Sequence, residues 1–128
     1  MLYLDSSAVV KIVSREPETA DMVRLVRADP SLVSSALAWT EVVRVVRMPG
    51  NTARAEDVLS GIALVPIDDG IIRSAATLVP PSFRTLNSIH LATVLSLGAD
   101  VSHLMRYDDR LAGEAGEAGI DVIAPGRG

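Results

Sequence analysis

The stretch Met1-Leu2-Tyr3-Leu4-Asp5-Ser6-Ser7-Ala8 determines how the rest of the chain is interpreted. Its first four residues have the near-continuous apolar character of a strand that is buried on both faces. Asp5 follows at the carboxyl end of that strand, where ligands bind in open α/β sheets. Aspartate and serine are also preferred caps of a following helix. Asp5 is therefore a helix cap, part of a functional site, or both.

The composition predicts one domain, residues 1–128, with an aliphatic core. Hydrophobic residues make up 48% of the chain and aromatic residues only 3%, so aliphatic side chains must fill the interior. The absence of cysteine excludes disulfides and thiolate metal sites and fits a reducing compartment. No apolar run reaches the roughly 20 residues of a membrane helix. We therefore expect a cytoplasmic protein without a signal peptide or a membrane partner.

The net charge of −4 argues against a protein that holds nucleic acid on a broad basic surface. It does not exclude a nuclease, because a metal ion can mediate between an acidic site and a phosphate. Every basic residue except Lys11 is an arginine. Arginine suits bidentate phosphate contacts, but genome composition explains this uniform bias more simply.

Short apolar segments alternate with helical segments along the whole chain. Strands are expected at 1–4, 31–34, 62–67, 101–107 and 120–123, and helices at 6–14, 17–29, 36–48, 51–60, 70–79, 86–98 and 110–119. This alternation predicts an α/β fold with a mostly parallel sheet of four or five strands, covered by helices on both faces. The helix at 86–98, which Thr85 is expected to cap, is apolar nearly all round and should be an interior helix.

Glu41 stands out in the helix expected at 36–48. A helical wheel places it inside a wide apolar arc. That arc consists of Leu37, Ala38, Trp39, Val42, Val43, Val45, Val46 and Met48. A buried carboxylate is costly unless it is paired, so Glu41 needs a partner, a metal ion or a raised pKa. Pairing with Arg44 or another arginine and binding of a metal both remain open.

Other polar residues stand where strands end or helices begin. Asp68 follows the third expected strand, and because a helix starts there, capping is the better explanation. Asp108 follows the fourth expected strand, and Asp109 is expected to cap the helix after it. Asn87 lies in the first turn of the interior helix, where backbone N–H groups favour an anion or an acceptor oxygen. His90 is interpreted as a hydrogen-bonded core histidine, and zinc has no support from the histidine spacing.

Four of these residues would converge at one edge of a doubly wound sheet: Asp5, Glu41, Asn87 and Asp108. Donors that are all oxygen suit Mg²⁺ or Mn²⁺. Such an ion can polarise a phosphate and lower the pKa of a bound water. The residues alone therefore favour hydrolysis of phosphodiesters, although each acid could also be a cap.

Four ordered motifs resemble PIN domains, and most closely the VapC-type toxins of bacterial toxin–antitoxin pairs. The motifs are Leu4-Asp5-Ser6-Ser7-Ala8, Thr40-Glu41, Arg84-Thr85-Leu86-Asn87-Ser88-Ile89-His90-Leu91-Ala92 and Tyr107-Asp108-Asp109-Arg110-Leu111. The resemblance covers essentially the whole chain. It implies a Mg²⁺- or Mn²⁺-dependent endoribonuclease whose acids map onto Asp5, Glu41 and Asp108. It also implies a homodimer or a hetero-oligomer with a cognate VapB-type antitoxin that inserts a peptide over the active site.

Two residues depart from the family pattern at the site. Asn87 stands where the family normally has aspartate, and Arg106 stands where it usually has threonine or serine. Asparagine removes a full negative charge, and an inward-pointing Arg106 would compete with the cation. An Arg106 that turns to solvent or pairs with Asp108 or Asp109 is the alternative. Weaker metal binding and slower cleavage are expected. A natural low-activity variant, a substitution that makes a toxic protein tolerable, and a site in which Asp109 substitutes would each fit. Ser6, Asp109 and Arg106 are the candidate supporting residues of the site.

Two functions therefore remain open. The first is a metal-dependent ribonuclease toxin, and the alternative is a catalytically inactive PIN-fold protein that binds antitoxin or RNA without cleavage. A phospho-receiver domain is excluded because its acidic pair after the first strand and its later lysine are missing. A haloacid-dehalogenase-like phosphatase is excluded because Ser7 occupies the position of its second aspartate.

Overall fold

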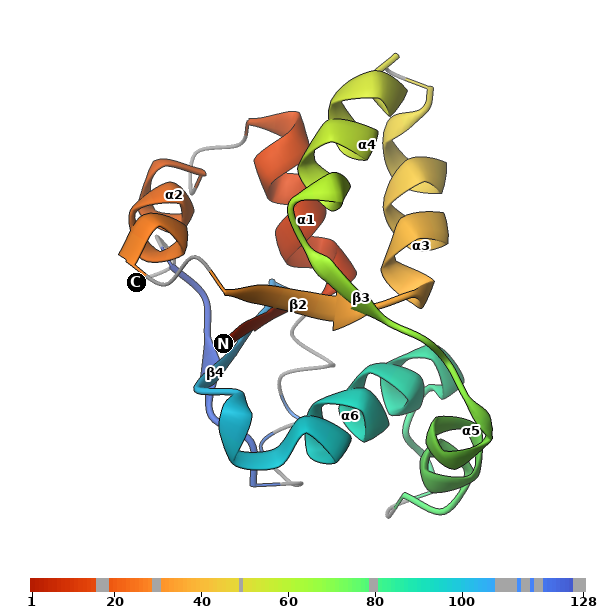
Figure 1. Ribbon diagram of the computed structural model, residues 1–128. Helices are drawn as coiled ribbons and strands as arrows, with labels where there is room; N and C mark the ends of the chain where they lie inside the picture. Colours follow the sequence, from red (N-terminus) through yellow and green to blue (C-terminus); the bar gives the residue numbers. More distant parts are fainter. Residues whose placement is uncertain are drawn as a thin grey trace.

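Five short strands form one sheet in the order β3-β2-β1-β4-β5, and each neighbouring pair is parallel (Figure 1). The computed structural model describes residues 1–15, 19–28, 31–48, 50–78, 81–107, 113, 116 and 119–125. The strands are β1 (Leu2–Leu4), β2 (Leu32–Ser35), β3 (Ala63–Val65), β4 (His103–Met105) and β5 (Val122–Ile123). The predicted α/β fold with a parallel sheet is confirmed.

Helices cover both faces of this sheet (Figure 1). On one face lie α1 (Ser6–Ser14), α2 (Thr19–Ala28), α3 (Leu37–Val46) and α4 (Thr52–Ser60). On the other face lie α5 (Asp69–Ala76) and α6 (Thr85–Leu97), and a 3₁₀ turn (Gly98–Asp100) leads from α6 towards β4. Within the described residues, no helix is long and apolar enough to cross a membrane.

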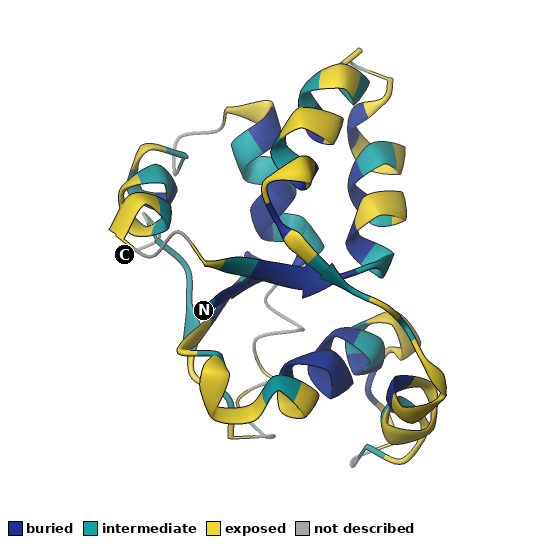
Figure 2. Cartoon of the chain, viewed as in Figure 1, coloured by how far each residue is buried: buried dark blue, intermediate teal, exposed yellow. Residues whose placement is uncertain are grey.

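The central strand β1 is buried on both faces because successive side chains of a strand point to opposite sides. Leu2 and Leu4 pack against Val9 of α1, whereas Tyr3 packs against Leu91 of α6. Figure 2 shows the same distribution, with the buried residues on the sheet and on the inner sides of the helices. Each fully buried leucine or valine contributes about 1.5–3 kcal/mol, so both faces stabilise the position of β1.

The strand order creates a topological switch point beside β1. The chain leaves β1 towards β2 and β3, and it then returns through α5 and α6 to β4 on the other side of β1. Ligands of open α/β sheets bind outside the carboxyl ends of the strands at such a point. A ligand site is therefore expected at the carboxyl ends of β1 and β4.

The apolar arc predicted for α3 is too wide. Trp39, Val45 and Met48 are 41%, 60% and 85% exposed, and the buried stripe is limited to residues one turn apart, Ala38, Val42 and Val46. The reason is that α3 packs against α1 and α4 along one side only. Glu41 lies at the border of the buried stripe and is half-buried.

Three other boundary predictions are wrong in detail. The third strand ends at Val65 rather than at residue 67, because Pro66 has no N–H with which to continue the ladder. The fourth strand covers only His103–Met105 of the expected segment. Arg84 rather than Thr85 is the N-cap of α6, and it makes no side-chain capping bond. The predicted helix at 110–119 falls almost entirely outside the described residues.

Candidate active site

Asp5 caps α1 and is also buried at the switch point. Its Oδ1 accepts hydrogen bonds from the backbone N–H of Ala8 (3.1 Å) and from the hydroxyl of Ser7 (2.7 Å). The residue is only 4% exposed. Both interpretations of Asp5 therefore hold, because the capping carboxylate lies where the central strand ends.

Ser7 connects the end of β1 to the end of β4. Its Oγ accepts a hydrogen bond from the backbone N–H of Tyr107 (2.7 Å), and the backbone N–H of Asp5 donates to the carbonyl of Met105 (3.1 Å). Tyr107 is the residue that precedes Asp108 in the sequence. Asp108 and Asp109 themselves lie outside the described residues, so their predicted roles stay predictions.

Glu41 reaches the same region from α3. Its Oε1 accepts a hydrogen bond from the hydroxyl of Ser6 (2.5 Å) and lies 2.7 Å from Nε2 of His90. The Glu41 side chain is 25% exposed, whereas Arg44 is exposed on the outer side of α3. The structure thus provides Glu41 with two partners from other elements in place of Arg44. Ser6, expected only as a supporting residue, brings Glu41 beside Asp5.

His90 is a residue of the candidate site that the sequence interpretation did not include. It is buried, as expected of a core histidine, and both ring nitrogens have partners: Nδ1 lies 2.8 Å from the Tyr3 hydroxyl, and Nε2 meets Glu41. The rings of Tyr3 and His90 are nearly perpendicular, at 87°, with centroids 5.9 Å apart. The available signal was the sequence spacing, since His90 follows Asn87 by one helical turn.

The protonation state of Tyr3 determines which atoms donate in the hydrogen bonds that lead from Tyr3 through His90 to Glu41. Burial, and then the negative charge of Asp5, raises the pKa of the Tyr3 phenol far above its usual range. A phenol that stays neutral can donate to Nδ1 of His90, which leaves the ring proton on Nε2 for donation to Glu41. Tyr3 and His90 therefore orient the Glu41 carboxylate from the α6 side of the sheet.

Asn87 carries a buried donor at the start of α6. It is the third residue of the helix and lies one turn before His90, so the two side chains share a side of α6. Its Nδ2 atom is buried and has no hydrogen-bond partner in the described part of the chain. A buried donor without a partner costs about 1–3 kcal/mol. An amide nitrogen favours a phosphate oxygen or a water rather than a cation.

Arg106 is half-buried directly after the end of β4. The parallel register pairs Leu4 with Met105, and its continuation sets Asp5 opposite Arg106. Leu104 packs on the α6 side, so alternation places Arg106 on that side too. Its Nε and Nη1 atoms are buried. Its guanidinium is therefore turned away from solvent, and whether it enters the metal site or pairs with Asp108 or Asp109 stays a prediction, because both acids lie outside the described residues.

The donor set matches a hard cation in type but is incomplete in the described residues. Asp5 and Glu41 supply carboxylates, which are the ligands that Mg²⁺ and Mn²⁺ prefer. No group of three histidine, cysteine or acidic residues that could hold a metal occurs in the described ranges. Asp108, the third expected carboxylate, lies outside them. The residues present fit the ion, and Asp108 is needed to complete the set.

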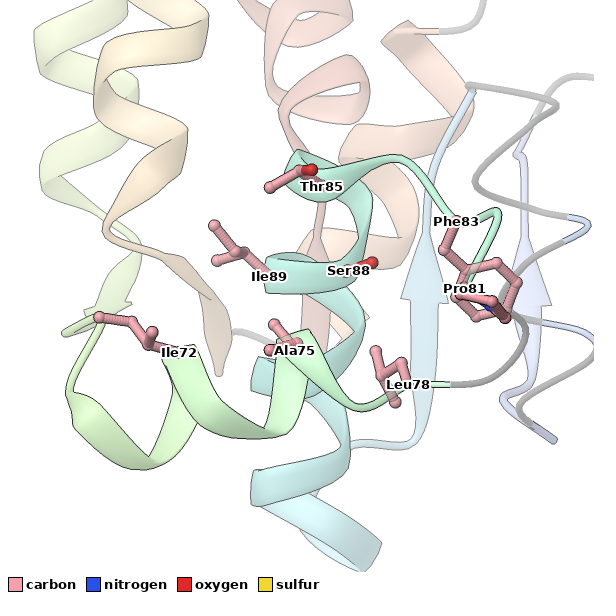
Figure 3. Close-up of a pocket in the computed structure, with 9 residues that line it drawn as sticks. Ile72, Ala75, Leu78, Pro81, Phe83, Thr85, Ser88 and Ile89 are labelled. Carbon is pink, nitrogen blue, oxygen red and sulfur yellow. The ribbon is translucent and has the colours of Figure 1, made fainter.

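Two cavities of similar volume flank the site. One, of about 400 Å³, opens between α1 and α3 and is lined by Ser6, Ser7, Val10, Lys11, Glu41, Val45 and Tyr107. The other, of about 340 Å³, lies between α5 and α6 (Figure 3), and Figure 3 shows mostly apolar side chains around it. Only Thr85 and Ser88 bring hydroxyl groups to the second cavity. The first cavity is the one with charged groups that can handle a polar substrate.

Comparisons with known proteins show which family the chain resembles. The model of the PIN domain family matches residues 2–115. Ribonuclease VapC46 of Mycobacterium tuberculosis is 43% identical to the chain over 126 residues, which is 97% of each protein.

Two solved structures share the fold. VapC20 of Mycobacterium tuberculosis, described as a toxin that cleaves the sarcin–ricin loop, superposes with a TM-score of 0.74 at 11% identity and covers 98% of this chain and 100% of its own. A toxin–antitoxin complex from Klebsiella pneumoniae gives a TM-score of 0.73 at 19% identity, with 98% of both chains covered. At these identities the two structures support the fold alone.

Proposed function

The chain belongs to the PIN domain family, and from that premise we propose that it is a metal-dependent endoribonuclease, the toxin of a toxin–antitoxin pair. One observation carries the proposal. Glu41 of α3 and His90 of α6 meet Ser6 directly beside Asp5, at the carboxyl end of the central strand. A structural cap at Asp5 needs none of these contacts.

Asp5, Glu41 and Asp108 are the residues that would hold Mg²⁺ or Mn²⁺. When bound, the ion would polarise the scissile phosphate and lower the pKa of a water molecule. The chain itself keeps the carboxylates in position: Ser7 donates to Asp5, and Ser6 and His90 hold Glu41. Such supporting contacts fix ligand orientation in metal sites generally.

Asn87 is proposed to orient the substrate or a water rather than to bind the metal. Its buried Nδ2 donor suits a phosphate oxygen. The loss of one carboxylate and the buried guanidinium atoms of Arg106 both make the site less negative than the family pattern, so we expect weakened metal affinity and slower cleavage.

The decisive experiment is cleavage of a panel of structured RNAs by this chain and by its Asn87→Asp variant, each with Mg²⁺, Mn²⁺ or EDTA. The panel should include a sarcin–ricin hairpin, the target named for VapC20. We expect metal-dependent cleavage that EDTA abolishes, with a rate at least about tenfold higher for Asn87→Asp because its restored charge binds the ion.

Each outcome of that panel has a meaning. Equal rates for both forms would show that Asn87 does not weaken the site. Cleavage that persists in EDTA would contradict the metal mechanism. If neither form cuts any RNA with either metal, the ribonuclease proposal is overturned in favour of the alternative, a PIN-fold binding protein. The uncharged Asn87 and the buried guanidinium atoms of Arg106 are the features that favour that alternative.

We also propose a small VapB-type antitoxin with an arginine-bearing tail as the partner, because the edge of the site is acidic. One of the structural neighbours is itself a toxin–antitoxin complex. The affinity of the pair should fall with salt and with removal of the tail arginines. A dissociation constant that is insensitive to both would contradict this charge complementarity. A homodimer remains a prediction.

A further inference from the structure

We propose that Lys11 and the cavity between α1 and α3 form a subsite for the RNA phosphate next to the scissile one. This inference rests on the proposed ribonuclease function and extends it to a residue outside the acidic set. The cavity is bordered by Glu41, Ser6 and Ser7 on the side of the site and by Lys11 further along α1.

The Lys11 ammonium is held at the wall of this cavity. Its Nζ lies 4.9 Å from the centre of the Tyr107 ring, which is a cation–π contact. That ring is itself fixed, since the Tyr107 N–H donates to Ser7 and its hydroxyl donates to the carbonyl of Pro125 (2.5 Å). The charge therefore has a defined place beside the strand end that leads to Asp108.

The spacing along α1 matches a contact to a neighbouring phosphate. Ser7 and Lys11 are four residues apart on one face of the helix, so they are separated by about 6 Å of rise. Ser7 marks the edge of the site because it bonds Asp5. The flexible four-carbon stem of Lys11 can follow a phosphate group that lies one step from the reacting one.

The positive charge of Lys11 would offset the repulsion between the acidic site and an RNA backbone. Carboxylates at Asp5 and Glu41 repel an RNA backbone, and the chain as a whole carries −4. Lys11 is the basic residue among the described side chains that line the cavity.

An anion is the occupant that these groups favour. Val10 and Val45 would also accept an apolar side chain of a protein partner, but an ammonium at the wall adds nothing to such a contact. A lysine is a compact point charge that binds phosphate well.

The test compares Lys11→Met, which keeps the length of the side chain, with Lys11→Arg, which keeps its charge. Arg73→Met is the matched control, because Arg73 is an exposed cation on α5 and its loss changes the net charge equally. Binding of a short fluorescent single-stranded RNA is measured in EDTA between about 50 and 200 mM salt. The salt dependence of kcat/KM in Mg²⁺ gives the same comparison during turnover.

Lys11→Met should bind about tenfold more weakly, and the slope of log K against log salt should fall by about 0.7, the value for one phosphate contact on a single strand. KM should rise with little change in kcat. Lys11→Arg and Arg73→Met should keep the original slope. Unchanged slope and KM in Lys11→Met, while the parent protein cleaves RNA, would overturn the subsite alone. Failure of the parent protein to bind or cleave RNA would overturn the ribonuclease proposal and the subsite together.

Discussion

Asp5 and Asp68 make the same local structure in different surroundings. Each stands before a helix with extended backbone angles, φ −76° and ψ 175° for Asp5 and φ −85° and ψ 179° for Asp68. Each carboxylate accepts from the N–H three residues on, at 3.1 Å from Ala8 and 2.9 Å from Ile71. Yet Asp5 is 4% exposed and Asp68 is exposed.

The position of the preceding strand in the sheet explains the difference. Asp5 follows the central strand directly, so β4 and the start of α3 close around it, whereas Asp68 comes after the edge strand β3. Helix capping is the same in both places. Beside Asp5, the Glu41 carboxylate of α3 and the His90 imidazole of α6 meet at the Ser6 hydroxyl, and the described residues show no such gathering at Asp68. That gathering distinguishes a candidate site from a cap.

The sharpest test of this comparison is the pair Asp5→Asn and Asp68→Asn. Asparagine is as good a cap as aspartate, so both variants should fold, and each loses one negative charge. Asp5→Asn should lower metal-dependent cleavage on the order of 100-fold to 1,000-fold, the loss typical of one preorganised electrostatic contact. Asp68→Asn should cleave at the rate of the parent protein. Initial rates on one RNA at saturating metal measure both.

Thermal unfolding of both variants serves as the control for folding. Similar losses of cleavage in the two variants would break the comparison, because the effect would then follow from the caps or from net charge. Full activity in Asp5→Asn would remove Asp5 from the site altogether.

A smaller loss is expected when the contact from α6 is removed. His90→Leu deletes the group that holds Glu41 and should lower kcat about 10-fold to 100-fold, as is common for residues that orient metal ligands. His90→Gln keeps an N–H for Glu41 and should restore part of that loss. Ser96→Ala, at an exposed position of the same helix, is the control.

Separate measurement of kcat and KM in the His90 variants distinguishes a misplaced Glu41 carboxylate from a loss of folded protein. A lower kcat with partial rescue by glutamine supports the positioning role of His90. If His90→Leu and His90→Gln lose activity equally, and only in proportion to their loss of folded protein, His90 is a structural residue. The surroundings of Asp5 would then need another explanation.

The sequence predicted the parallel sheet because alternating strands and helices leave few other topologies. It also predicted that Asp68 is a cap, which the structure confirms. It could not separate the two roles of Asp5, since the same residue type at the same local position serves both. Burial depends on strand order, and strand order follows from contacts between distant segments.

The same limit applies to Glu41 and His90. Periodicity placed Glu41 in an apolar arc, but only packing shows that Val45 and Met48 remain exposed and that Glu41 sits at the border. His90 was correctly predicted to be a hydrogen-bonded core residue. Its bond to Glu41 joins residues that are 49 positions apart. Neither the periodicity of the helix with Glu41 nor that of the helix with His90 contains information about this pairing.

The smallest expected effect concerns Tyr3, which shares the surroundings of Asp5 and has no counterpart near Asp68. Burial, and then the charge of Asp5, raises the pKa of the Tyr3 phenol, so the folded protein holds this proton more tightly than the unfolded chain does. The resulting stabilisation is complete below the unfolded pKa of about 10 and is lost as the pH rises further. The free energy of unfolding should therefore fall above pH 10 by at most about 1.4 kcal/mol per pH unit through this group.

Urea denaturation between about pH 8 and pH 11 should show this fall in the parent protein and a shallower one in Tyr3→Phe. Equal slopes for the two proteins would mean that Tyr3 ionises as an exposed phenol does, and the neutral donor to His90 would be lost from the site.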